Sequence, residues 1–276
     1  MKLFPKIFLP TLLILTVIFL NPVLLFFSKH LLPKPPIYPF NPSEEVKIAT
    51  VAGKIKYSVD YTIVLVGDSM TERLGNGDEL KGYLSLYYPN KTFEILNYGF
   101  GATNILSLPD RLTTATFMKR EFRPILDIDF DLLLIESFGY NPLSELSLEQ
   151  GLRKQSEMLD ISLNLIDSAQ KKARVAFFTT IAPNKDIFSK GIVELSATQR
   201  SSWVKERNRY IENHTAYAKT HQLPLIDIYH SSLDLFGNGK SIYIDSQDNL
   251  HPSPTGIFFI SQQLASGISK LQLLKN

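Results

Sequence analysis

The sequence predicts an α/β fold in which helices cover both faces of a parallel sheet, as a doubly wound three-layer α/β/α sandwich. Two observations support this prediction. Short apolar runs rich in Val, Ile and Leu alternate along the chain with longer segments of helical period. The runs are continuous rather than alternately polar, which is typical of parallel strands that are buried on both faces.

The elements follow one another in a regular order. Five apolar runs are predicted as strands, at 61–67, 92–97, 131–136, 174–179 and 223–229. Helical spacing predicts helices at 71–86, 105–122, 147–171, 197–220 and 256–271. Gly75 and Gly77 make the start of the first helix irregular. With right-handed crossovers, this order gives a flavodoxin-like sheet of about five parallel strands.

The first 60 residues predict a membrane anchor and a spacer. Lys2 and Lys6 precede an uncharged, largely apolar run at 7–27, and a helix of about 20 such residues spans a bilayer. We expect an uncleaved signal-anchor over 1–30, a proline-rich linker and edge segment over 31–60, and one catalytic domain over 61–276. The positive-inside rule then makes the protein a single-pass membrane protein with an extracytoplasmic domain. The alternative is a cleaved signal peptide and a secreted protein.

Composition excludes several classes of function. The net charge of +2 predicts no nucleic-acid partner, and the absence of cysteine excludes disulfides, thiolate metal sites and a cysteine nucleophile. No dinucleotide, Walker A or His-Glu-x-x-His motif occurs, so we expect no cofactor and no metal. His214 and His221 share one face of a predicted helix, which we expect to be solvated rather than metal-binding.

Two short segments carry candidate chemistry. Gly67-Asp68-Ser69 follows the first predicted strand, at the carboxyl end where parallel sheets place their ligand sites. On position alone, Ser69 would more often cap a helix than act as a nucleophile. Near the other end of the chain, Asp248 precedes His251 by three residues in a Pro-flanked loop. This pair can supply a general base and the carboxylate that orients it. Asp68 and Asp227 are expected to be structural.

These segments belong to a set of four blocks that resembles the signature of the SGNH, or GDSL, hydrolases. The resemblance covers roughly residues 60 to 265, and the blocks occur in the family's order. They are Gly67-Asp68-Ser69, Asn97-Tyr98-Gly99-Phe100-Gly101-Ala102-Thr103, Gly139-Tyr140-Asn141 and Asp248-x-x-His251-Pro252.

The resemblance implies a role for each block. Ser69 would be the nucleophile, His251 the base and Asp248 its orienter. The oxyanion hole would comprise the Ser69 N–H, a backbone N–H of the second block and the Asn141 side chain. Two departures stand out, since Pro142 replaces the family's usual Asp and the second block is one residue short. We therefore expect Gly101 as the second donor, with Ala102 as the alternative.

The resemblance and the predicted anchor together imply a membrane-anchored serine esterase. Its substrate would be a small acyl ester, such as an O-acetyl group on a cell-envelope glycan, or a lipid ester. One alternative is an O-acyltransferase of the same fold, in which a sugar hydroxyl resolves the acyl-Ser69 intermediate. Another is a catalytically silent domain that binds a glycan or a protein, for which Pro142 and the shortened second block are the support.

Overall fold

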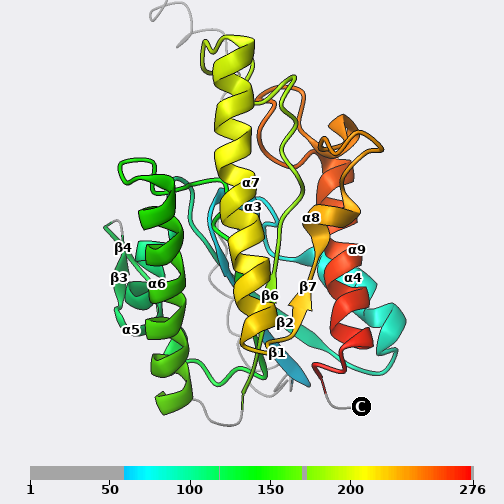
Figure 1. The fold of residues 1–276 in the computed structure, drawn as a ribbon. Coiled ribbons are helices and arrows are strands. Elements are labelled where there is room, and N and C mark those ends of the chain that lie inside the picture. Colours follow the sequence, from blue (N-terminus) through cyan, green and yellow to red (C-terminus); the bar gives the residue numbers. More distant parts are fainter. Residues whose placement is uncertain (1–58, 118, 170–172, 275–276) are drawn as a thin grey trace, which may run out of the picture. The chain divides into compact units, whose positions relative to one another are not determined.

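The structure is a computed structural model, and it describes residues 59–117, 119–169 and 173–274 (Figure 1). The predicted signal-anchor and nearly all of the linker lie outside these residues. None of the helices within the described ranges combines the length and the apolar composition that crossing a bilayer requires. The anchor therefore stays a prediction from sequence.

A five-stranded parallel sheet forms the centre of the domain, as the sequence predicts. Its strands lie in the order β2-β1-β5-β6-β7, which is the flavodoxin-like order once only these five strands are counted. The strands are β1 (Tyr61–Gly67), β2 (Phe93–Gly99), β5 (Leu132–Glu136), β6 (Arg174–Phe178) and β7 (Leu225–Ile226). All neighbouring strands are parallel.

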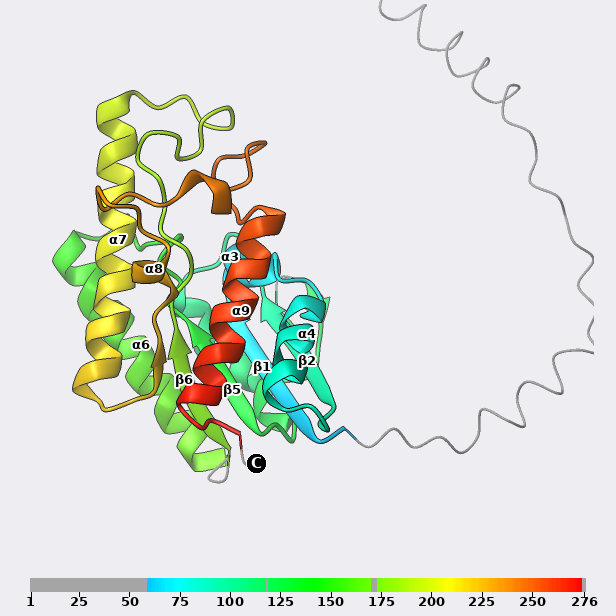
Figure 2. The same cartoon turned by 90° about the vertical axis from the view of Figure 1, so that its right-hand side faces the viewer.

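Helices cover the two faces and produce the three layers (Figure 2). On one face, α4 (Asp78–Tyr87) and α9 (Pro254–Lys270) bury leucine and isoleucine side chains against β1, β5 and β6. On the other face, α5 (Leu108–Thr113), α6 (Leu148–Ala169) and α7 (Ala197–Thr220) enclose a second apolar cluster. Because β1 and β5 are buried on both sides, their sequences contain no alternating polar positions.

Two predicted helices differ from the structure. The helix expected at 71–86 is interrupted, with a short α3 (Ser69–Glu72) before α4, because Gly75 and Gly77 adopt positive φ angles between them. The helix expected at 105–122 is wrong after residue 113. There the chain forms a small antiparallel pair, β3 (Thr116–Phe117) and β4 (Arg120–Glu121).

The expectation of a solvated histidine face on α7 is also wrong for His214. Its ring is fully buried and stacks on Phe177, with centroids 4.5 Å apart. Burial lowers the pKa of His214 to about 3, so the ring is neutral and packs as a core aromatic group. His221 lies further along the chain, just after the last residue of α7. Its side chain is 47% exposed and its ring stacks on Tyr217.

Close packing of β2 on α3 generates a prediction about the glycine that permits it. A Cβ on Gly99 would lie 2.2 Å from the Glu72 backbone nitrogen, whereas a Cβ on Gly82 in α4 would meet nothing within 4 Å. We expect Gly99→Ala to cost about 1–3 kcal/mol of unfolding free energy through overpacking. Gly82→Ala should instead stabilise the protein by about 0.5–1 kcal/mol, since alanine favours the helix. Urea unfolding of both variants tests this, and equal effects would contradict it.

Candidate active site

Ser69 lies where β1 ends, at the first residue of α3. The backbone turns there because Asp68 caps the helix, its side-chain Oδ1 accepting the Met70 N–H at 2.8 Å. Asp68 is fully buried, so its expected structural role is confirmed. Ser69 itself is half-buried, as a hydroxyl that must meet a substrate should be. The turn thus presents Ser69 at the carboxyl edge of the sheet.

Asp248 and His251 form a tight pair in the loop before α9. His251 Nδ1 lies 2.7 Å from Asp248 Oδ2, and the backbone N–H groups of Leu250 and His251 both donate to Asp248 Oδ1 at 2.9 Å. An Nδ1–H donated to this carboxylate leaves Nε2 as the proton acceptor of the ring. The spacing of three residues produces this geometry because both side chains come from one turn of backbone.

Electrostatics keep this carboxylate ionised. Burial alone would raise the pKa of Asp248, but the hydrogen bonds from the backbone and ring of His251 and from Leu250 outweigh it and lower the pKa below its usual value. The Arg73 guanidinium, 3.6 Å from Asp248 Oδ2, adds a favourable charge. The ionised carboxylate can therefore stabilise a positively charged imidazolium.

An ion pair, a hydrogen bond and close packing bring all four blocks to one end of the sheet. Arg73 begins the turn after α3 and pairs with Asp248, which ties the Ser69 helix to the Asp248–His251 loop. The Asn141 Nδ2 donates to Asp68 Oδ2 at 3.0 Å. A Cβ on Gly101 would lie 3.8 Å from the Ser69 Cβ, so the second block also lies beside the serine.

The geometry of the second block bears on which residue could bind an oxyanion. The Gly101 N–H donates to the Glu72 Oε2 at 2.9 Å, so that donor already has a carboxylate acceptor. The next residue, Ala102, has a positive φ of 56°, which turns the chain sharply beside Ser69. The Asn141 amide carries two N–H groups, so its bond to Asp68 leaves a second donor.

A buried charged cluster beneath these residues was not anticipated from the sequence. Arg111 of α5 has no exposed surface and donates to the carbonyl oxygens of Gly67 and Tyr98 and to the hydroxyl of Thr103. Glu136, at the end of β5, accepts the Asp68 N–H at 3.2 Å and the Ser137 hydroxyl at 2.6 Å. The sequence did contain a signal for Glu136, because it is a charged residue at the end of an otherwise apolar strand.

Burial shifts the pKa values of the groups in this cluster. Burial, followed by the nearby Asp68 charge, raises the pKa of Glu136 well above its usual value. Burial likewise raises the pKa of Asp68 and lowers the pKa of Arg111 to about 10. The three groups fix the ends of β1 and β5 in a region from which water is excluded.

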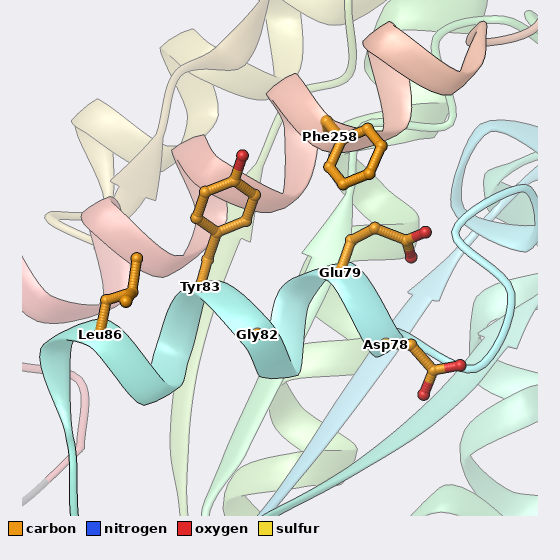
Figure 3. Close-up of a pocket in the computed structure, with 6 residues that line it drawn as sticks. All are labelled: Asp78, Glu79, Gly82, Tyr83, Leu86 and Phe258. Carbon is orange, nitrogen blue, oxygen red and sulfur yellow. The ribbon is translucent and has the colours of Figure 1, made fainter.

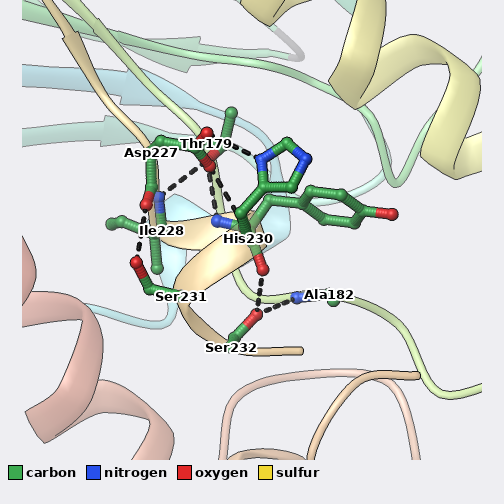
Figure 4. Close-up of polar contacts among 8 residues, drawn as sticks. Thr179, Ala182, Asp227, Ile228, His230, Ser231 and Ser232 are labelled. Atoms are coloured by element: carbon green, nitrogen blue, oxygen red, sulfur yellow. Dashed lines mark hydrogen bonds and ion pairs between the residues drawn. The ribbon is translucent and has the colours of Figure 1, made fainter. Parts of the chain in front are cut away.

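A second Asp-x-x-His pair provides an internal comparison (Figure 4). His230 Nδ1 lies 2.7 Å from Asp227 Oδ2, and Asp227 caps α8 (Ile228–Ser231) after β7. The Thr179 hydroxyl accepts the N–H groups of the first two α8 residues. The His230 side chain is 54% exposed, against 17% for His251. The pair is therefore a solvated helix cap with the same local geometry as Asp248–His251.

A surface groove between α4 and α9 lies apart from these residues. Its volume is about 420 Å³, and Figure 3 shows Tyr83, Leu86 and Phe258 along it with Asp78 and Glu79 at one end. Another groove, of about 460 Å³, runs along β2 and includes Glu72 and Gly99. Neither Ser69 nor His251 lines either groove.

Comparison with solved structures finds the same fold in esterases. The lipase/acylhydrolase from Enterococcus faecalis superposes with a TM-score of 0.54 at 18% identity, covering 76% of this chain and 96% of that chain. A catalytic mutant of Axe2, an acetylxylan esterase from Geobacillus stearothermophilus, gives 0.54 at 12% identity over 78% and 96%. The acetyl xylan esterase AlAXEase gives 0.54 at 16% identity over 75% and 99%. No protein-family model and no curated protein matches the chain. At these identities the similarity establishes the fold.

The raised pKa of Glu136 predicts how stability depends on pH. The folded protein holds a proton that the unfolded chain releases near pH 4.5, so this contribution to the unfolding free energy is present below that pH. It is lost as pH rises towards the higher folded pKa. We expect Glu136→Gln to reduce the decline of the unfolding free energy above pH 4.5. Urea unfolding at a series of pH values measures this decline.

Glu149→Gln is the matched control, because it removes a carboxyl group from a side chain that is 85% exposed on α6. It should leave the pH profile of stability unchanged. A Glu136→Gln profile with the wild-type slope would contradict the assignment of a raised pKa to Glu136.

Proposed function

We propose that this protein is a serine esterase of the SGNH type. The observation that supports it most directly is the His251–Asp248 contact of 2.7 Å, held beside the Ser69 helix through Arg73. The pair provides a base with a defined tautomer, and Ser69, at the start of α3, provides a hydroxyl at the sheet edge. The solved esterases with this fold add an independent reason to expect ester chemistry.

The proposed reaction uses these groups in two steps. His251 Nε2 takes the proton of the Ser69 hydroxyl as the oxygen attacks the ester carbonyl, and Asp248 stabilises the imidazolium that forms. The imidazolium then protonates the leaving alkoxide, which departs and leaves an acyl-Ser69. Water, deprotonated by the same histidine, attacks the acyl carbon and releases the carboxylic acid and the serine.

The developing oxyanion needs backbone and amide donors. We propose the Ser69 N–H, the second N–H of the Asn141 amide and, in the second block, the Ala102 N–H. Ala102 is favoured over Gly101 because Glu72 already accepts the Gly101 N–H at 2.9 Å. A carboxylate at the oxyanion position would also repel the negative charge that forms there. In this arrangement Glu72 holds the turn that aims Ala102 at the substrate.

For the substrate we propose a small acyl ester on an envelope glycan. Two of the solved structures with this fold are named as acetylxylan esterases, a name that describes cleavage of acetyl esters on a glycan. The predicted signal-anchor would hold the enzyme at the outer surface of the membrane, where such glycans occur. A catalytically silent binding domain would lack the reactive serine, and a fluorophosphonate probe distinguishes the two because it labels only an activated hydroxyl.

Loss of either reacting group should abolish activity. We expect Ser69→Ala and His251→Ala to lower kcat/KM for p-nitrophenyl acetate by at least about 10³-fold, since the groups act as one unit. His230→Ala is the matched control, because His230 has the same 2.7 Å contact with an aspartate three residues before it. It should retain nearly wild-type activity. Equal loss in His230→Ala and His251→Ala would argue against His251 as the base.

Two Glu72 variants separate the possible backbone donors. If Ala102 is the donor, Glu72→Ala frees the turn and should lower kcat by about 10-fold or more, whereas Glu72→Gln keeps an acceptor for the Gly101 N–H and most of the activity. If Gly101 is the donor, Glu72→Ala releases its N–H, so kcat should stay level or rise in that variant. Steady-state kinetics on the soluble ester decide between them, with circular dichroism as the control for folding.

A further inference from the structure

A tight turn near the candidate site displays two large apolar side chains to solvent. Leu235 is 100% exposed and Phe236 is 89% exposed, and they are adjacent in the chain. Burying either would gain favourable free energy, and scattered single exposures are the ordinary pattern on soluble surfaces. Two adjacent exposed apolar side chains at the tip of one turn therefore indicate an interaction surface.

The turn is rigid, so the exposure is built into the fold. The Asp234 carboxylate accepts the N–H groups of Phe236 and Asn238 at 2.8 and 2.9 Å, and Leu233 bridges to Gly239. Asn238 is buried and its amide donates to Asn184 and Asp186 of the preceding loop. The two acidic side chains at the base are thus engaged in holding the turn, while its tip points into solvent.

Lysines flank the tip. Lys185 is exposed, and its backbone N–H donates to the Asn238 side chain at 2.9 Å, which places it at the base of the turn. Lys240 follows the turn directly and lies over the Tyr243 ring. Apolar side chains at a tip with cationic side chains behind them match the layers of an anionic bilayer, in which acyl chains lie beneath phosphate headgroups.

The neighbouring loops continue this surface. The loop 183–196 exposes Ile192 and Val193, and the segment after the turn exposes Ile242. The loops 183–196 and 232–252 lie at the same end of the domain in both views (Figures 1 and 2). They are joined by a hydrogen bond from the Ser189 N–H to the Asn249 carbonyl at 3.0 Å. Asn249 lies between Asp248 and His251, so the apolar loops and the candidate base share one segment.

We propose that the Leu235–Phe236 turn inserts into an anionic lipid surface and docks this end of the domain on the bilayer. The apolar run at 7–27 gives a separate reason to expect a bilayer close by, since a linker of 30 residues reaches less than about 100 Å. The docking does not depend on the esterase assignment. Where that assignment also holds, docking places Ser69 towards esters at the lipid–water interface.

The absence of cysteine makes the test direct. Full-length Phe236→Cys, labelled with an environment-sensitive nitrobenzoxadiazole probe, is added to vesicles of phosphatidylcholine and phosphatidylglycerol. We expect a blue shift and quenching by nitroxide-labelled lipid. Leu86→Cys is the matched control, because Leu86 is 75% exposed and lies in the groove of Figure 3, whose lining, among the residues that the structure describes, includes two carboxylates and no lysine. A response at position 236 no larger than at position 86 would overturn the proposal.

Charge reversal tests the choice of lipid. In the Phe236→Cys background, Lys185→Glu with Lys240→Glu should weaken vesicle-dependent quenching by about fivefold or more, since each lysine near an anionic surface contributes to binding. Undiminished quenching in that variant, or equal quenching in pure phosphatidylcholine, would overturn the anionic assignment. A concentration-dependent blue shift without vesicles would identify a second copy of the chain as the partner instead. No readout here involves catalysis, so failure of the esterase proposal would be seen separately.

Discussion

The buried guanidinium of Arg111 is the interaction on which the candidate site depends. It donates to the carbonyl oxygens that end β1 and precede the end of β2, and to the Thr103 hydroxyl of the second block. The Gly67 carbonyl also accepts the Phe100 N–H at 3.2 Å, so Arg111 adds a second donor where the chain leaves the sheet. Burial lowers the pKa of Arg111, and the neighbouring Asp68 carboxylate is the main group that favours the cation. Removing one member would leave the others buried without compensation.

The same cluster explains how residues far apart in sequence reach one place. Asp68 caps the Ser69 helix, accepts from Asn141 of the third block and donates its backbone N–H to Glu136. Arg73, one turn after Ser69, reaches Asp248. The serine helix is thus held from below by buried carboxyls and from the side by the loop that carries the histidine. Each contact limits one direction in which the helix could move.

Much of this was predictable from sequence. Continuous apolar runs identified all five sheet strands, and the four blocks identified residues that lie at one end of the sheet. Helix boundaries failed where local and tertiary effects competed. Gly75 and Gly77 divide the predicted helix into α3 and α4 through positive φ angles, and the segment after residue 113 pairs as a hairpin although its apolar spacing is helical. His214 is buried because α7 packs on the sheet over a wider arc than its mixed composition indicates. Which backbone N–H faces Glu72 depends on the exact turn at Ala102, and no residue pattern encodes that.

The two Asp-x-x-His pairs carry a lesson about recognising sites of this kind. Asp227 and Asp248 each cap a turn and each bind the imidazole three residues later at the same distance. The local chain therefore makes an oriented imidazole readily, wherever an aspartate ends a strand or a loop. The surroundings differ: the His230 side chain is 54% exposed, whereas the His251 side chain is 17% exposed and its aspartate also pairs with Arg73. A search by the Asp-x-x-His spacing alone would therefore return a helix cap as well as the candidate base.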